Sequence, residues 1–291
     1  MKYPEKIDLH LHTNVSDGTD TPKELLQAVR DFGLDLFSVT DHDAIKSSRD
    51  ILKLLEKDDP WFITGVEFSC RDEEGQYHIL GYGYDPDGAS ICRLVDKGHA
   101  FRMNKVKARL DFITSEFGFR FSEEDIRELF AQDNPGKPHI ANMMVRYGYV
   151  KTKEEAIKDY INKIHFKSEY VRPEQAITAI TESGGIPVLA HPSYGSGDQI
   201  IVGTELEERI KRLMKYGLKG VEAFYSGFTD RLMNELLSYA DRYSLMVTAG
   251  SDYHGRNKLV ELGDTNCINA AEGPDGLLAF IEEARKRQPA A

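Results

Sequence analysis

Near its N-terminus the chain reads Ile7-Asp8-Leu9-His10-Leu11-His12-Thr13. Apolar and polar residues alternate along this stretch, which is the period of a β-strand. The alternation places Asp8, His10 and His12 on one face, so that both imidazoles point the same way and can hold one metal ion. A lone His-x-His is also common on exposed strands, so the rest of the sequence must decide between the two interpretations.

The remaining sequence favours a metal site. Histidines and carboxylates recur in or at the ends of predicted strands, in Thr40-Asp41-His42, Gly65-Val66-Glu67, Tyr77-His78-Ile79, Ala190-His191-Pro192 and Ser251-Asp252-Tyr253-His254. In folds with parallel strands, ligands gather at the carboxyl ends of the strands. The same residue types at the same topological position therefore predict one shared site.

Strand and helix patterns alternate along most of the chain. The predicted strands are 7–12, 35–40, 62–69, 77–84, 186–191, 220–225 and 245–250. The predicted helices are 22–32, 44–57, 173–183, 204–216, 229–242 and 275–287. This order predicts an α/β fold with parallel pairing, in which seven strands and outer helices form a barrel rather than a sandwich.

One region contains no predicted strand. Helical patterns fill it at 90–116, 122–131, 138–147 and 153–163, and Ser122 is placed to cap the second of these helices. We interpret residues 1–291 as a single barrel domain, interrupted by a helical insertion at about 95–165 that binds substrate.

Composition narrows the function classes. The 291 residues carry a net charge of −11, which argues against wide, sequence-blind binding to nucleic-acid backbone but allows a small anionic substrate beside bound metals. No stretch approaches the roughly 20 apolar residues of a membrane span, and the N-terminus lacks an apolar signal core. Cys70, Cys92 and Cys267 have no metal-like spacing, so we expect free thiols and a cytoplasmic location.

With these motifs in this order, the chain resembles the PHP (polymerase and histidinol phosphatase) family of metal-dependent phosphoesterases, kin of the amidohydrolases. The resemblance covers nearly the whole chain. It implies a distorted (β/α)7 barrel with two or three divalent metals at its C-terminal mouth.

The resemblance also implies the roles of individual residues. A first metal is expected on His10, His12, Glu67 and Asp252, and a second on Glu67, His78 and His191. A third is expected on Asp17, His42 and His254, although Asp17 lies in a short loop and has the alternative of a turn residue. Glu67, Asp252 and His191 are the expected catalytic residues. Asp41 is expected to orient a ligand, with a strand-end turn carboxylate as the alternative.

The ligand chemistry agrees with the resemblance. Imidazoles and carboxylates without a thiolate suit Zn²⁺, Mn²⁺ or Fe²⁺. A bridging carboxylate implies metals roughly 3.5–4 Å apart, which acidify a shared water and draw charge off a phosphoryl oxygen. Hydroxide formed near neutral pH makes a separate nucleophilic Ser or Cys unnecessary. No Gly-x-Ser-x-Gly, P-loop or Gly-x-Gly-x-x-Gly motif is present.

Candidate substrate contacts come mainly from the insertion. Lys137 and His139 open a helix, where an anion is favoured, with an ordinary helix-terminal histidine as the alternative for His139. Their segment resembles the Gly-Arg-x-His segment in the PHP branch of nucleoside 3′,5′-bisphosphate phosphatases and 5′-end-directed RNA exonucleases, with Lys in place of Arg. The other candidates, each with a surface or packing alternative, are Arg102, Arg172, Arg256 and Tyr194.

The function predicted first is therefore hydrolysis of a small phosphorylated nucleoside or sugar, with removal of the 3′-phosphate of a nucleoside 3′,5′-bisphosphate favoured. A phosphodiesterase acting on a ribose cyclic phosphate comes next, and a histidinol-phosphate phosphatase third. Short RNA ends are a further class of partner. Outside this class, an amide hydrolase and a structural PHP module remain as alternatives.

Overall fold

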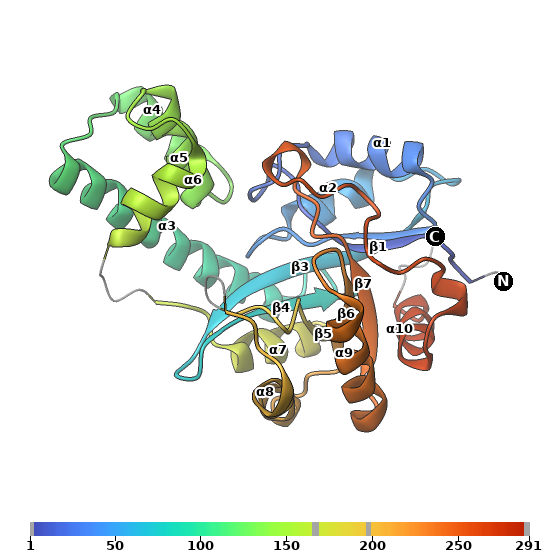
Figure 1. The fold of residues 1–291 in the computed structure, drawn as a ribbon. Helices are drawn as coiled ribbons and strands as arrows, with labels where there is room; N and C mark the ends of the chain where they lie inside the picture. Colours follow the sequence, from blue (N-terminus) through green and yellow to red (C-terminus); the bar gives the residue numbers. More distant parts are fainter. Residues whose placement is uncertain (1–2, 165–168, 196–198, 288–291) are drawn as a thin grey trace.

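The computed structural model describes residues 3–164, 169–195 and 199–287. Seven strands form one sheet in the order of the sequence (Figure 1). They are β1 (Ile7–Leu11), β2 (Leu36–Val39), β3 (Trp61–Arg71), β4 (Gln76–Tyr82), β5 (Ile186–Leu189), β6 (Gly220–Tyr225) and β7 (Met246–Gly250). The end of β1 also meets the chain after β7, because the His12 N–H donates to the Tyr253 carbonyl at 2.9 Å. The sheet therefore nearly closes into the predicted barrel.

One strand runs against the others. β4 is antiparallel to both β3 and β5, whereas the other neighbouring pairs are parallel. The prediction of parallel pairing is wrong for β4, because only residues 72–75 join it to β3, and a parallel connection needs a dozen or more residues. As a result His78, near the start of β4, pairs with Ser69 near the end of β3. The reversal thus brings His78 to the end of the barrel where the parallel strands finish.

Helices cover the outside of the barrel. They are α1 (Pro22–Phe32), α2 (Lys46–Leu54), α7 (Pro173–Glu182), α8 (Gly203–Lys215), α9 (Asp230–Tyr243) and α10 (Asp275–Arg285), with 3-10 turns η3 (Gly255–Asn257) and η4 (Ala270–Glu272). α1 shows why they form where predicted. Thr21 and Glu24 make a reciprocal capping box, and Gly33 ends the helix with a φ of 76°. Its buried residues Leu25 and Val29 belong to the same apolar cluster as strand residues.

The region between β4 and α7 is helical, as predicted. It contains α3 (Ala89–Phe117), α4 (Glu123–Ala131), α5 (Lys137–Arg146), α6 (Lys153–Glu155), the π-helix η1 (Ala156–Tyr160) and the 3-10 turn η2 (Ile161–Lys163). Ser122 caps α4 by accepting the Asp125 N–H. α3 starts against the barrel and carries the following helices away from it (Figure 1). These helices share an apolar cluster of their own, which includes Val106, Ile113 and Ile140.

Candidate metal centre

The nine predicted metal ligands lie together at one end of the barrel. Each has a nitrogen or oxygen within 3.9 Å of another member of the set. Most of them follow the carboxyl ends of strands β1, β2, β5 and β7, while Glu67 lies in β3 and His78 in the reversed β4. Residues far apart in the sequence therefore meet at the position that the strand pattern predicts.

The first group surrounds one oxygen of Glu67. Glu67 Oε2 lies 3.3 Å from both His10 Nε2 and His12 Nε2, and Asp252 Oδ1 lies 3.6 Å and 3.2 Å from the same two nitrogens. Four ligands at about 2.1 Å from one tetrahedral ion would lie about 3.4 Å apart. The spacing of these four atoms thus matches a single metal position.

The other oxygen of Glu67 faces a second group. Glu67 Oε1 lies 2.7 Å from His78 Nδ1 and 3.2 Å from His191 Nε2. Because the two carboxylate oxygens point to different sets of imidazoles, Glu67 has the geometry of a bridging ligand.

The third group contains Asp17. Asp17 Oδ1 lies 3.2 Å from His254 Nε2, and Asp17 Oδ2 lies 3.9 Å from His42 Nε2. The other ring nitrogen of His42, Nδ1, lies 3.0 Å from Glu67 Oε2. His42 therefore stands between the first and third groups, and Asp17 faces histidines rather than serving only as a turn residue.

The hydrogen bonding of the donor atoms also fits a divalent metal, and this observation is independent of their spacing. Several of them are buried and make no hydrogen bond of acceptable geometry, namely His10 Nε2, His12 Nε2, His42 Nδ1, His78 Nδ1 and Glu67 Oε2. Buried polar atoms are nearly always satisfied in native proteins. A cluster of unsatisfied nitrogens around one carboxylate is the arrangement that a metal centre requires.

The ionisation of the carboxylates in the site also fits metal binding. Burial alone would raise the pKa of Glu67, but the neighbouring His42, His78 and His10 lower it well below its usual value. The pKa of Asp252 is also lowered, against burial, by Lys258 and His10. Burial would lower the pKa of His12, yet Asp252 and Glu67 raise it to about 9. The carboxylates are thus ionised at neutral pH, which is the form that binds metal.

The PHP domain family matches residues 8–225 of this chain. The chain belongs to this family.

Three curated relatives of this PHP-domain protein have different names. A 5′-3′ exoribonuclease of Haemophilus influenzae is 27% identical over 89% of this chain and 93% of that protein. A phosphoribosyl 1,2-cyclic phosphate 1,2-diphosphodiesterase of Eggerthella lenta is 28% identical over 86% and 94%. A 3′,5′-nucleoside bisphosphate phosphatase of Chromobacterium violaceum is 26% identical over 85% and 87%.

A solved structure agrees with the family. A protein of Bifidobacterium adolescentis, assigned as a metal-dependent phosphoesterase, superposes with a TM-score of 0.82 at 25% identity. The match covers 98% of the PHP-domain protein and 96% of that chain. The predicted PHP barrel is therefore confirmed at the level of the whole fold.

Glu222 of β6 holds two of the candidate ligands, His10 and His191, and it was not among the residues predicted from the sequence. Its Oε1 lies 2.8 Å from His10 Nδ1, and its Oε2 accepts the His191 N–H at 2.8 Å. His191 has a φ of 28°, which is rare for a residue with a side chain, so this hydrogen bond holds a strained backbone. The available signal was an acid inside the otherwise apolar strand Gly220-Val221-Glu222-Ala223.

Asp41 acts on the loop rather than directly on a ligand ring. Its carboxylate accepts hydrogen bonds from the Thr13 N–H at 2.8 Å, the Thr13 hydroxyl at 2.6 Å and the Ser16 hydroxyl at 2.5 Å. Ser16 Oγ in turn lies 3.4 Å from His12 Nδ1. Asp41 is thus linked to the His12 ring through Ser16.

Asp252 is held by Tyr225 and Lys258. Tyr225 donates its hydroxyl to Asp252 Oδ2 at 2.8 Å, and Lys258 Nζ lies 2.5 Å from the same oxygen. Asp252 Oδ1 remains for the first metal group. Arg256 is exposed and its backbone N–H binds Thr19 Oγ1 at 3.1 Å, so among the described residues Lys258 is the cation that reaches the ligands from this loop.

The structure brings three of the predicted substrate residues to the border between barrel and insertion. Arg102 donates a hydrogen bond to Asp43 Oδ2 at 2.6 Å, and Asp43 directly follows the candidate ligand His42 in the chain. Lys137 donates to Asn162 Oδ1 at 2.6 Å and has no carboxylate partner among the described residues. His139 accepts the Gly136 N–H through Nδ1 at 3.0 Å, and burial lowers its pKa, so the ring is neutral.

Two other predicted contacts lie elsewhere. Arg172 makes a bidentate ion pair with Glu73 at 2.9 Å for both bonds, so its guanidinium is already matched at the surface. Tyr194 donates its hydroxyl to the Gly227 carbonyl at 2.6 Å and packs against Tyr225. Tyr194 is thus part of the rim packing next to a residue that holds Asp252.

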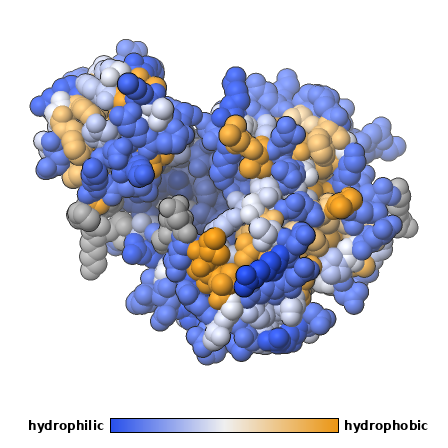
Figure 2. Space-filling view, viewed as in Figure 1, coloured by the Kyte–Doolittle hydropathy of each residue, from blue (hydrophilic) through white to orange (hydrophobic). Residues whose placement is uncertain are grey.

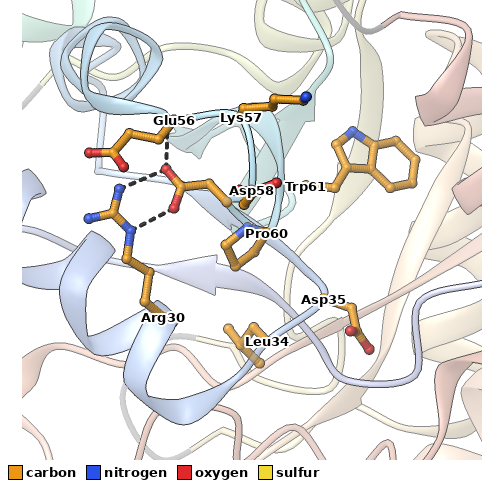
Figure 3. Close-up of a pocket in the computed structure, with 9 residues that line it drawn as sticks. Arg30, Leu34, Asp35, Glu56, Lys57, Asp58, Pro60 and Trp61 are labelled. Atoms are coloured by element: carbon orange, nitrogen blue, oxygen red, sulfur yellow. Dashed lines mark hydrogen bonds and ion pairs between the residues drawn. The ribbon is translucent and has the colours of Figure 1, made fainter.

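A cavity of about 660 Å³ lies at the other end of the strands (Figure 3). Its wall includes Asp35 and Trp61, which lie at the beginnings of β2 and β3, while the metal ligands lie at the other ends. Inside it Arg30 makes a bidentate pair with Asp59, at 2.6 Å and 2.7 Å. The Arg30 guanidinium is therefore matched inside this cavity, which is separate from the metal centre.

Proposed function

We propose that this PHP-domain protein is a metal-dependent hydrolase of phosphoester bonds that removes the 3′-phosphate from a nucleoside 3′,5′-bisphosphate. The observation that carries the class is the buried Glu67, whose two oxygens face two separate sets of imidazoles. When bound, divalent metals would supply Lewis acidity at the phosphoryl oxygens and would acidify water.

The residues divide the work between holding metals and holding substrate. His10, His12 and Asp252 would hold one ion with Glu67, which would share its second oxygen with the ion on His78 and His191. Asp17, His42 and His254 would hold a third. Glu222 fixes the ring of His10, so that its Nε2 faces the site. Mn²⁺, Zn²⁺ and Fe²⁺ all suit these donors.

Residues of the insertion would orient the substrate. Arg102 lies beside the metal ligands, and Lys137 and His139 lie at the start of α5, where backbone N–H groups favour an anion. The bisphosphatase of Chromobacterium violaceum and the exoribonuclease of Haemophilus influenzae support a substrate with a nucleoside and more than one phosphate. Short RNA ends are thus a related substrate class.

The diesterase of Eggerthella lenta supports a second candidate, because its identity of 28% is similar to those of the other relatives. In that case the enzyme would open a ribose cyclic phosphate before it removes the remaining ester. The same metal centre would serve both reactions, so the two candidate functions are distinguished by which substrate the enzyme hydrolyses.

The experiment is a comparison of phosphate release by the manganese-loaded protein. The substrates are adenosine 3′,5′-bisphosphate, a ribose cyclic phosphate, histidinol phosphate and a short 5′-phosphorylated RNA. We expect release from the bisphosphate, its loss in His10→Ala and Asp252→Ala, and its retention in His99→Ala, a histidine outside the three candidate ligand groups. No release from any substrate with metal bound would contradict the proposal and favour an amide hydrolase or a binding module.

A further inference from the structure

The third ligand group, Asp17, His42 and His254, lies on loops rather than within strands. Asp17 lies between β1 and α1, His42 between β2 and α2, and His254 between β7 and η3. Ligands on loops hold a less constant geometry than ligands on strands unless other contacts fix their backbone. Here the main-chain carbonyl of each of the three residues accepts a hydrogen bond from an asparagine, either Asn257 or Asn134. These two asparagines therefore hold the backbone of the whole group.

Asn257 joins two members of the third ligand group. Its side-chain Nδ2 donates to the Asp17 carbonyl at 2.7 Å, and its backbone N–H donates to the His254 carbonyl at 3.3 Å. The ring of His254 is fixed as well, because its Nδ1 lies 2.8 Å from the Asp252 carbonyl while its Nε2 faces Asp17 Oδ1 at 3.2 Å. Asn257 therefore ties the loop after β1 to the loop after β7.

The orientation of the Asn257 amide is set from the insertion. Lys153, the first residue of α6, donates to Asn257 Oδ1 at 2.8 Å, and both residues are partly buried. Because the amide oxygen must face the ammonium group, the NH₂ group must face Asp17. The partner of Lys153 is thus a neutral amide rather than a carboxylate. The insertion reaches Asp17 through these two hydrogen bonds in series.

Asn134 holds the remaining member of the group. It lies between α4 and α5 in the insertion, is only 2% exposed, and donates its Nδ2 to the His42 carbonyl. Its Oδ1 is buried and makes no hydrogen bond to the described residues. A buried polar atom without a partner destabilises a fold, so packing alone does not explain an asparagine at this position. The bond to His42 is the contact that gives Asn134 a role.

The rest of the junction between insertion and barrel is polar. The helices of the insertion have an apolar cluster of their own, and Figure 2 shows a hydrophilic hollow between the insertion and the barrel. Beyond α3, the described insertion also reaches the barrel through the ion pair of Asp133 with Lys46, whose side chains are 47% and 55% exposed. Such an exposed pair contributes little to stability. The bonds of Lys153 and Asn134 are therefore the less exposed contacts of this junction, and both lead to the third ligand group.

We propose that docking of the insertion completes the third metal position, with Asn134, Lys153 and Asn257 as positioning residues. The third position is part of the proposed function, on which this inference rests. Glu222 of the barrel contacts candidate ligands of the first two groups, so those groups keep their geometry without the insertion. The protein therefore holds two ions through the barrel alone and a third ion whose affinity depends on the insertion.

The test is the amount of Mn²⁺ bound by the full-length protein over a series of free Mn²⁺ concentrations. It is measured for the wild type, Lys153→Met, Asn257→Ala and the control Lys158→Met, which alters an exposed lysine of the adjoining η1. We expect the wild type to bind three ions. Lys153→Met and Asn257→Ala should each weaken one ion about tenfold, the effect of losing a residue that orients a ligand, and leave the other two unchanged. Lys158→Met should bind all three as the wild type does.

A double variant separates positioning from a general loss of structure. Lys153→Met combined with Asn257→Ala should bind the third ion no more weakly than Asn257→Ala alone, because Lys153 acts through Asn257. Losses that add in the double variant would overturn the proposal. A wild type that binds only two ions would overturn it too, as would unchanged binding in Lys153→Met. Equal weakening of all ions, with earlier thermal unfolding of the metal-free variant, would show a structural role instead and also overturn it.

The proposed function is decided by a different readout. Metal binding is measured without substrate, so its result is the same whichever phosphate ester is hydrolysed. Protein that binds three ions with the expected losses but releases no phosphate would support the positioning role while the proposed function fails. Phosphate release with only two ions bound would support the proposed function and overturn the positioning role.

Discussion

Glu222 Oε1 lies 2.8 Å from His10 Nδ1, and neither side chain has exposed surface. The carboxylate fixes the ring so that Nε2 faces Glu67 and Asp252. The other oxygen of Glu222 accepts the His191 N–H. One carboxylate from β6 thus contacts candidate ligands of both groups that share Glu67.

Glu222→Gln should weaken both metal groups. Glutamine keeps the size of the side chain but has only one acceptor oxygen, so either His10 or the His191 N–H must face an NH₂ group. Loss of such a supporting partner lowers metal affinity by about 10–100-fold. Manganese content at fixed free metal should fall, excess manganese should restore kcat, and the exposed Glu208→Gln should behave as wild type. Unchanged manganese affinity in Glu222→Gln would contradict this role.

Tyr225→Phe should affect activity more than folding. The variant removes the hydroxyl that donates to Asp252 Oδ2, while Lys258 still holds that oxygen. We expect the free energy of unfolding to fall by about 1 kcal/mol, the usual contribution of one hydrogen bond, and kcat to fall several-fold. Tyr239→Phe, which removes a hydrogen bond to the Gly203 carbonyl, should destabilise similarly with kcat unchanged. Equal kcat values for the two variants would count against a function for Tyr225.

Gly250→Ala should disrupt the centre through packing alone. A Cβ at this position would lie 2.3 Å from His10 Cβ and 2.5 Å from Glu222 Oε1, so both side chains must move. Overpacking of this kind costs roughly 1–3 kcal/mol, and metal affinity should fall with it. Gly98→Ala, in helix α3, meets only ordinary contacts at 3.4 Å or more and should be neutral or stabilising. Thermal unfolding and manganese content of the two variants check this contrast.

The pH dependence of substrate binding should report Lys105, which lies three positions after Arg102 on α3. Its pKa, lowered to about 7 by burial and neighbouring arginines, means that it is charged below about pH 7 and neutral above. Lys105→Arg keeps the charge throughout. The ratio of the wild-type KM for the bisphosphate to that of Lys105→Arg should therefore rise up to about tenfold from pH 6 to pH 8. Titration of the substrate and of the metal ligands cancels in this ratio, so a ratio that is constant with pH rules out the effect.

Much of the fold and the ligand set could be predicted from local sequence. Alternating residues identify β1, and each of the seven predicted strands overlaps an observed one. The ligands His42, His191 and Asp252 were found because they directly follow strands, a position that chain order alone defines. Helix starts such as Thr21 and Ser122 were predictable because capping depends on residues only three positions apart.

The rest depends on contacts that span the chain. Glu222 and His10 are separated by 212 positions, and nothing local to either residue indicates the other. The direction of β4 follows from the length of its turn, which the overall alternation of strands and helices obscured. The surface pairing of Arg172 with Glu73 likewise requires two distant segments to meet. Charges inside apolar strands and the lengths of connections were the available signals.

The central claim is that Glu67 joins two metal positions in one hydrolytic centre. The most direct measurement is bound manganese together with phosphate release from adenosine 3′,5′-bisphosphate, for wild type, Glu67→Gln and His78→Ala. The wild type should bind at least two ions and release phosphate. Glu67→Gln should lose metal from both positions, His78→Ala from one, and both variants should lose activity. Glu67→Gln protein that keeps its manganese and hydrolyses the substrate at the wild-type rate would contradict the account.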